Sequence, residues 1–87
     1  MDETTEIKTA MKDGVAIVGE ERTLKLLRNK KVRKVFMASN TKQDLKDDLK
    51  HYTQLASVEL VELSLTNEEL GTLCKKPFSI SVLGISE

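Results

Sequence analysis

The sequence predicts an α/β protein in which four helices alternate with four strands, in the order αβαβαβαβ. The first observation behind this prediction is that the apolar residues recur at helical and at strand spacing in turn along the chain. The second is that the chain has no linker, low-complexity stretch or internal repeat, and that Pro77 is its one proline. Strands that are separated by helices are joined by crossovers, so we expect a largely mixed or parallel sheet between layers of helices. Since 87 residues leave no room for a second core, we expect residues 1–87 to form a single domain.

The first half of the chain is expected to contain two helices and two strands. Apolar residues at i, i+3 and i+4 predict a helix over 3–12. The continuous apolar run at 15–18 is typical of a buried strand. Gly19 then lets the chain turn sharply into a helix over 21–30, and the segment 32–38 is predicted to be the second strand.

The second half of the chain repeats this alternation. Residues 39–41 supply a turn and a helix cap, and apolar residues at i, i+4, i+7 and i+11 predict a helix over 45–56. A third strand is expected over 58–63. The segment 66–69 (Thr-Asn-Glu-Glu) is typical of a capping box that opens a short helix ending near Cys74. The alternating segment 78–85, which follows Pro77, is predicted to be the fourth strand.

The formal net charge of zero conceals a strong asymmetry along the chain. Residues 1–21 hold two bases and six acids, residues 22–50 ten bases and three acids, and residues 51–87 two bases and five acids. Seven of the bases fall within residues 22–34, which contain no acid: Arg22, Lys25, Arg28, Lys30, Lys31, Arg33 and Lys34. This run is either a solvated face balanced by acids elsewhere in the fold or a basic patch for a phosphate backbone, and charge alone does not separate the two.

The residue types that most enzymes need do not form a constellation in this sequence. His51 is the one histidine and falls on the polar side of its helix, while Cys74 has the setting of a small core residue. We therefore expect no catalytic site, no metal site and no cofactor, and no Gly-rich phosphate loop is present. The Asp residues at 44, 47 and 48 alternate with Lys at 42, 46 and 50, which favours ion pairs within the helix.

Cysteine usage and hydropathy indicate a soluble protein of a reducing compartment. One cysteine excludes an internal disulfide framework. No apolar run approaches the roughly 20 residues of a membrane helix, so no membrane association is expected. The acidic N-terminus lacks the pattern of a signal peptide, and the chain is expected to be cytoplasmic.

Four short motifs, in register over residues 15–85, are similar to those of one known family. They are Gly-x-x-x-Thr-x-Lys-x-Leu-Arg at 19–28, Ala-x-Asn-Thr at 38–41, Tyr-x-x-Leu at 52–55 and, most specifically, Asn-x-Glu-Leu-Gly-Thr at 67–72. On these residues the chain resembles the ribosomal thirty-e family of archaeal and eukaryotic large subunits, within the kink-turn RNA-binding superfamily. The resemblance implies a three-layer α/β/α sandwich around a four-stranded mixed sheet.

The resemblance also implies a function and a set of site residues. The expected activity is non-enzymatic binding of a kink-turn or kink-turn-like internal loop by three loops, which follow the first strand, the second strand and the fourth helix. The RNA-binding residues carried over by position are Gly19, Glu21, Arg22, Lys25, Arg28, Asn40, Thr41, Lys76 and Phe78. The expected partners are ribosomal RNA, the protein's own messenger and ribosomal proteins, with a monomer outside the ribosome.

Each of these residues has a role in RNA binding and a structural alternative. Lys25 and Arg28 either contact phosphates or simply lie on the solvent-exposed face of a helix. Asn40 reads a base edge or caps the third helix, and Phe78 packs on an unstacked base or is the first core residue of the fourth strand. Gly71 is expected to be structural, because glycine on a crowded helix permits close packing.

The sequence departs from the family pattern in the first loop. Glu21, preceded by Glu20, stands where the ribosomal family usually carries Lys or Arg, although the next residue, Arg22, restores a positive charge. An acid at this position costs affinity for phosphate unless it accepts a hydrogen bond from a guanine edge. The second hypothesis is therefore a module of the same fold that has lost specific RNA binding and now binds protein.

Overall fold

The computed structural model describes residues 3–86 and confirms the predicted alternation of four helices and four strands. The elements, in chain order, are α1 (Glu3–Asp13), β1 (Ala16–Val18), α2 (Glu20–Arg28), β2 (Val32–Met37), α3 (Gln43–Ala56), β3 (Glu59–Glu62), α4 (Asn67–Leu73) and β4 (Val82–Ser86).

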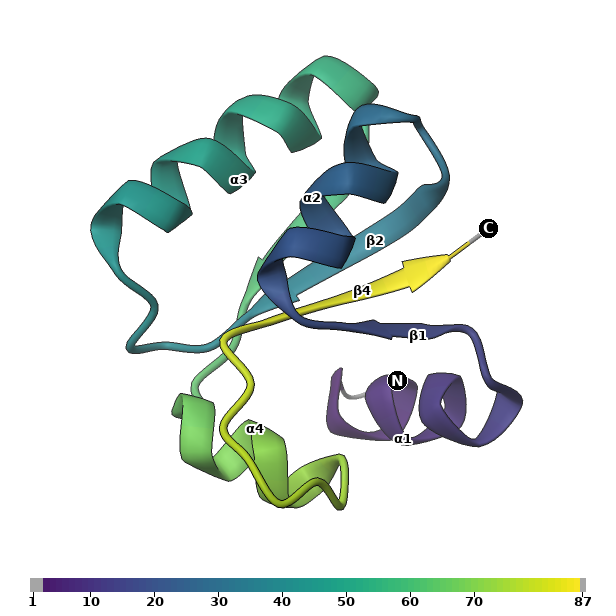
Figure 1. Ribbon diagram of the computed structural model, residues 1–87, viewed down its shortest axis with the longest axis vertical. Coiled ribbons are helices and arrows are strands. Elements are labelled where there is room, and N and C mark those ends of the chain that lie inside the picture. The colour runs from purple at the N-terminus through teal and green to yellow at the C-terminus, as the bar shows by residue number, and fades with distance from the viewer. Residues whose placement is uncertain (1–2, 87) are drawn as a thin grey trace.

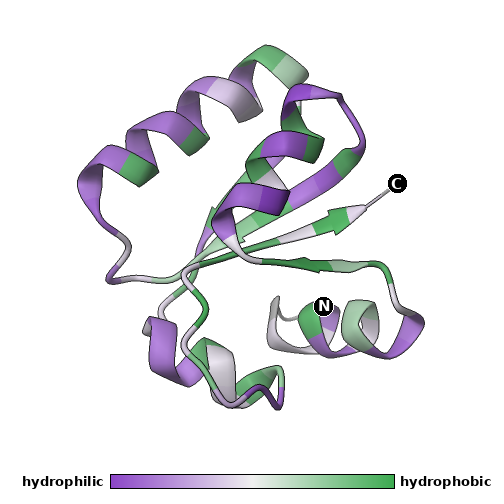
Figure 2. Cartoon of the chain, in the orientation of Figure 1, coloured by the Kyte–Doolittle hydropathy of each residue, from purple (hydrophilic) through white to green (hydrophobic). Residues whose placement is uncertain are grey.

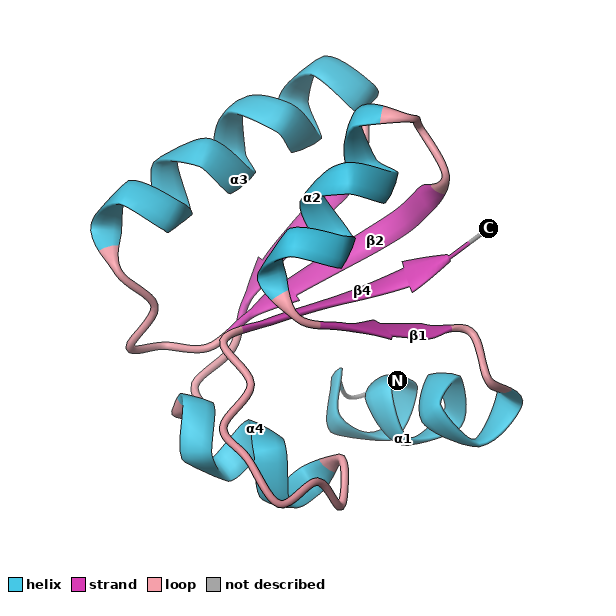
Figure 3. Cartoon of the chain, in the orientation of Figure 1, coloured by secondary structure: helices cyan, strands magenta, loops and turns pink. Residues whose placement is uncertain are grey.

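The four strands form one mixed sheet in the order β1-β4-β2-β3. β2 and β3 are parallel, as the crossover through α3 requires, and β4 is antiparallel to both of its neighbours. Helices α2 and α3 cover one face of the sheet, and α1 and α4 lie on the other side (Figures 1 and 3). The predicted three-layer α/β/α architecture is therefore confirmed.

Two separate cores flank the sheet, and β2 with Ala38, the residue that follows it, contributes to both of them. Phe36 and Ala38 pack on the side of α1 and α4, while Val35 and Met37 pack on the side of α2 and α3. This alternation follows from the two-residue period of a strand. In Figure 2 the apolar positions of the helices lie toward the sheet and the polar positions lie away from it.

The prediction that the fourth strand begins at residue 78 is wrong. β4 begins at Val82, and residues 75–81 form an irregular connection in which Phe78 is 54% exposed. Ile80 is the exception in this segment, because its side chain is buried in the core on the α4 side. The alternation of Phe78 and Ile80 resembles a strand, but the backbone of this segment bonds to loops and to α4.

The predicted cap of the third helix is also wrong, whereas that of the fourth is confirmed. α3 begins after Lys42, which makes no side-chain cap, and the Thr41 hydroxyl instead donates to the carbonyl oxygen of Ala38 at 2.7 Å. At α4, the Thr66 hydroxyl accepts from the amide of Glu69 at 3.3 Å, and the Glu69 carboxylate accepts from the amide of Thr66 at 3.0 Å. This reciprocal pair is the predicted capping box.

Several single-residue predictions were tested by the packing. Cys74 is a buried core residue, as expected, and its burial raises the pKa of the thiol. Lys46 does not pair within its helix but reaches Glu62 on β3 at 3.1 Å.

Within residues 3–86, no helix is long and apolar enough to cross a membrane.

Candidate nucleic-acid interface

Three loops meet at one end of the sheet, which we call the three-loop end. They are the β1–α2 turn at Gly19, the β2–α3 loop over 38–42 and the α4–β4 loop over 74–81 (Figure 1). The Gly19 amide donates to the carbonyl oxygen of Val82 at 3.1 Å, and the Ala38 amide donates to that of Ser81 at 2.8 Å. These bonds fix the first two loops against the segment where the third loop enters β4.

A pair of asparagines closes the arrangement. The Asn40 side chain donates to the Asn67 side-chain oxygen at 2.9 Å and accepts from the Asn67 amide at 2.9 Å. The Asn67 carbonyl oxygen accepts from the amide of Ile80 at 3.0 Å. Asn67 therefore joins the second loop, the third loop and the start of α4. The structural alternative for Asn40, a cap on the third helix, is wrong.

Gly19 leaves open space beside the backbone at the start of α2. Its φ is +108°, a region that favours glycine, and a Cβ built on it would meet nothing within 4 Å. It precedes the first turn of α2, where backbone N–H groups lack partners within the helix and the helix dipole is positive. This corner of the three-loop end is therefore accessible to another chain's backbone or base.

A cleft of about 540 Å³ lies between α2, the β2–α3 loop and α3. Its walls include Glu21 from α2, Asn40 and Lys42 from the second loop, and Asn67 from α4. Four carboxylates line it: Glu20, Glu21, Asp44 and Asp48. Carboxylates accept hydrogen bonds and repel phosphate, so the cleft suits groups that present N–H donors, such as base edges.

The cations predicted to contact phosphate do not all lie at this end. Arg22 and Lys25 are exposed on the first two turns of α2, and neither forms an ion pair within residues 3–86. Arg28 lies at the opposite end of the helix, with its guanidinium 5.2 Å from the centre of the Tyr52 ring. Eight residues separate it from Glu20, a distance of about 12 Å along a helix.

Lys34 belongs to the basic run in the sequence, but its charge is paired with carboxylates within the fold. Its ammonium group is 2.7 Å from Glu6 and 3.0 Å from Glu59, and it lies 5.2 Å from the centre of the Phe36 ring. The two carboxylates, first of all through the hydrogen bond to Glu6, raise the pKa of Lys34. This member of the basic run is therefore structural, because it links α1, β2 and β3.

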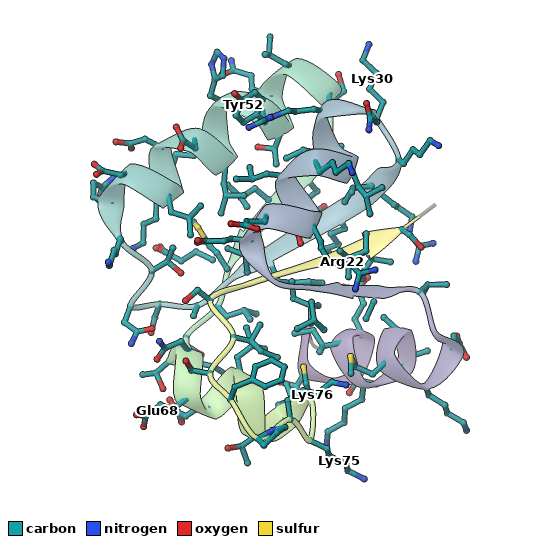
Figure 4. The ribbon with its side chains drawn as sticks, viewed as in Figure 1. Arg22, Lys30, Tyr52, Glu68, Lys75 and Lys76 are labelled. Carbon is teal, nitrogen blue, oxygen red and sulfur yellow. The ribbon has the colours of Figure 1, made fainter. Side chains whose placement is uncertain are left out.

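The third loop holds Lys76 and Phe78 at the surface. Both side chains are exposed, so the structural alternative for Phe78, a core residue of the fourth strand, is wrong. The Lys76 amide donates to the Gly71 carbonyl oxygen at 3.0 Å, and the Phe78 carbonyl lies directly against the Cα of Gly71. Close packing on Gly71, as predicted, therefore sets the path of this loop. Lys76 and Glu68 lie near the α4 side of the molecule in Figure 4.

The remaining predicted site residue, Thr41, lies inside the protein. It is 7% exposed, and its hydroxyl also lies 3.3 Å from the carbonyl oxygen of Ser81. The sequence interpretation missed Asn67, Ser81 and Lys42. Asn67 stood inside the matched motif at 67–72 but was interpreted only as part of a capping box. Ser81 gave no signal, since its backbone carbonyl makes the bonds.

Comparison with known proteins places the chain among ribosomal proteins. The sequence profile of the family described as "Ribosomal protein L7Ae/L30e/S12e/Gadd45 family" matches residues 2–87. The large ribosomal subunit protein eL30 of Sulfolobus acidocaldarius is 42% identical over 92% of this chain and 77% of its own length. That of Archaeoglobus fulgidus is 40% identical over 95% of this chain and 92% of its own length. These relatives carry the name of a ribosomal protein and not of an enzyme.

Two solved structures share the fold at low sequence identity. A protein of unknown function from Bacillus halodurans C superimposes with a TM-score of 0.87 at 19% identity, over 97% of this chain and 83% of its own. The 15.5kD RNA binding protein of Giardia lamblia gives 0.81 at 17% identity, over 100% of this chain and 77% of its own. At these identities the likeness establishes the fold alone.

Proposed function

The chain belongs to the ribosomal protein L7Ae/L30e/S12e/Gadd45 family, and on that premise we propose that it is an RNA-binding component of the large ribosomal subunit. It recognises a kink-turn or kink-turn-like internal loop with its three-loop end. The observation that carries this proposal is the network through Asn40, Asn67 and Ser81, which holds three loops in one rigid arrangement. Such preorganisation suits recognition by shape, since little order is lost on binding.

Phosphate contacts come from exposed cations of α2 and of two of the loops. Arg22 and Lys25 are exposed on α2, the helix that follows the first loop, and Lys76 is exposed in the third loop. Lys42, which lines the cleft, adds a fourth positive charge from the second loop. Arg28 is left out of this set, because it is held against Tyr52 at the other end of α2.

Base recognition falls to the cleft and to Phe78. Glu21 accepts a hydrogen bond from the N–H donors of a base edge, and Asn40, whose amide has one free N–H, donates a further one. The open space beside Gly19 admits the RNA backbone. The exposed ring of Phe78 packs against an unstacked base. Thr41 contributes by holding the second loop in place.

A fluorescence-anisotropy titration tests this function. A kink-turn RNA is compared with a perfectly paired duplex at about 50 and about 200 mM salt. We expect tighter binding of the kink-turn at both concentrations. Arg22→Ala combined with Lys25→Ala weakens binding and reduces the salt slope by about one to two phosphate contacts. The matched control, Lys30→Ala with Lys31→Ala, removes the same charge from the turn after α2 and leaves the slope unchanged.

The other outcomes contradict the proposal in different ways. Equal, salt-sensitive binding of both RNAs reduces the three-loop end to a general phosphate patch. Binding of neither RNA favours the second candidate function, a protein-binding module, for which the specific observation is the set of four carboxylates in the cleft. In that case a defined protein, and not nucleic acid, is expected to co-purify with the chain.

The ribosomal role brings further expectations about partners and location. We propose ribosomal RNA as the main ligand, the protein's own messenger as a second one, and neighbouring ribosomal proteins as contacts on a cytoplasmic ribosome. Outside the ribosome the chain is proposed to be a monomer. Sedimentation of the purified protein tests the monomer, and sedimentation with the large subunit in a cell extract tests the location.

A further inference from the structure

The end of the molecule opposite the three-loop end carries a groove of about 340 Å³, which we call the far-end groove. It lies between the last turn of α2, the α2–β2 turn and the last turns of α3. Its lining residues are Leu27, Arg28, Lys30, Tyr52, Leu55 and Ala56. Tyr52 and Lys30 mark this end in Figure 4, away from the labelled Lys76 and Glu68.

The groove exposes an unusual amount of apolar side chain. Leu55 is 65% exposed, whereas the apolar residues of an amphipathic helix such as α3 ordinarily face the core. Ala56 and Tyr52, on the same helix, are half-buried beside it. The chain itself covers none of these three side chains fully, so a partner that inserts an apolar side chain here removes surface from water on both sides.

Positive charge borders this apolar surface on the side of α2 and the α2–β2 turn. The two segments that form the groove, residues 22–34 and 49–58, contain no acid. Lys30 and Lys31 are exposed in the turn and form no ion pair within residues 3–86, and Arg28 is held in place over Tyr52. Glu59 begins β3 at the same end of the sheet, but its carboxylate is paired with Lys34.

The chemistry of the groove favours a protein partner over RNA. An aromatic face is the usual platform for a base, and here the guanidinium of Arg28 already covers one face of Tyr52. The other lining side chains of α3, Leu55 and Ala56, are aliphatic and offer nothing to a sugar–phosphate chain. An apolar anchor bordered by positive charge is complementary to an acidic segment with one apolar side chain.

We propose that the far-end groove is a docking site for an acidic segment of another protein. One leucine-like side chain of that segment packs beside Leu55, and its flanking carboxylates face Lys30, Lys31 and Arg28. The protein thereby joins an RNA at one end to a protein at the other. This proposal is independent of the proposed RNA interface, since none of the groove's residues belongs to the three-loop end.

A peptide selection tests the proposal without a known partner. A random library of roughly ten-residue displayed peptides is selected on the wild-type chain and counter-selected on the double variant Lys30→Glu, Leu55→Ser. We expect enrichment of peptides with several acids around one apolar residue. A synthetic copy of an enriched peptide binds the double variant at least about tenfold more weakly, because it loses the apolar contact and meets a like charge. In NMR spectra it shifts the amide signals of Lys30 and Leu55.

Two controls separate this outcome from misfolding and from failure of the RNA proposal. Both substituted side chains are exposed, so the double variant retains the melting temperature and the kink-turn affinity of the wild-type chain. The proposal is overturned if no acidic peptide is enriched, or if the enriched peptides bind the double variant equally well. It is also overturned if a plain RNA duplex, added at low salt, shifts the same amide signals and displaces the peptide.

Discussion

Replacement of Gly71 by alanine tests how the third loop is positioned. Gly71 is buried in α4, and a Cβ at this position would overlap the carbonyl oxygen of Phe78. It would also lie 3.2 Å from the Phe78 carbonyl carbon and 3.3 Å from the Cα of Ser79. All three are backbone atoms, so no side-chain rotation relieves the overlap. The loop must therefore move away from α4.

The expected magnitude comes from two opposing terms. Alanine in place of glycine within a helix ordinarily stabilises by about 0.5–1 kcal/mol. Overpacking against neighbours that cannot rotate costs about 1–3 kcal/mol, and backbone atoms place this case toward the upper value. We expect a net loss of about 2 kcal/mol in the free energy of unfolding. For a domain of this size that corresponds to a fall of roughly 8–16 °C in melting temperature.

Urea unfolding followed by circular dichroism measures this loss, and Thr72→Ala is the matched control. Thr72 is the exposed neighbour on the same helix, and its hydroxyl donates only to the Glu68 carbonyl oxygen at 3.1 Å. The control is expected to stay within about 0.5 kcal/mol of wild type. If Gly71→Ala is as stable as the wild-type chain or more stable, helix propensity dominates and the loop is not wedged against α4 as described.

Two further predictions concern other contacts. Asn40→Ala removes both hydrogen bonds to Asn67, and it is expected to cost about 1 kcal/mol of stability and to weaken kink-turn binding. Urea unfolding measures the stability, fluorescence anisotropy measures the binding, and the control Asn29→Ala is expected to change neither. Because its carboxylate partners raise the pKa of Lys34 above 10.5, the ion pair stabilises the fold below that pH, and this contribution is lost as the pH rises through the folded-state pKa. We therefore expect the wild type to be more stable than Lys34→Met by about 1 kcal/mol at pH ~8, and this difference to shrink above pH ~10.5. A difference that does not change with pH would contradict the ion-pair explanation.

The order of the elements could be predicted because apolar periodicity is a local property of the chain. The number and order of helices and strands were confirmed for this reason, and the capping box at residues 66–69 was confirmed because it is a motif of four consecutive residues. The start of β4 was mispredicted because it depends on a contact between Gly71 and Phe78, which no periodicity encodes. The strand order β1-β4-β2-β3 is likewise a tertiary outcome, since it brings the last strand between the first two.

The candidate site was predictable only as far as its motifs were. Gly19, Glu21 and Asn40 do gather at one end, as the matched loops implied. Lys25 and Arg28 are three residues apart, a spacing that places them on one side of a helix. That spacing does not reveal that Arg28 lies at the end of α2 away from the loops. The position of Arg28 depends on Tyr52, which lies on another helix.

The net charge of zero does not argue against RNA binding, because the acids line the cleft while three of the four proposed phosphate-contacting cations, Arg22, Lys25 and Lys76, are not among its lining residues. The acids that line the cleft are Glu20, Glu21, Asp44 and Asp48. Arg22 directly follows Glu21, and Lys25 directly follows Leu24, which also lines the cleft. Because successive residues of a helix are rotated by about 100°, both cations project away from the cleft-lining side of α2. A plain nucleic-acid backbone is attracted to the cationic side chains but repelled by the carboxylates of the cleft. A folded internal loop that turns base edges inward and phosphates outward satisfies both. We infer that in the proposed site the acids select against plain duplex, which makes preference for the kink-turn over duplex a sharper test of the proposal than affinity alone.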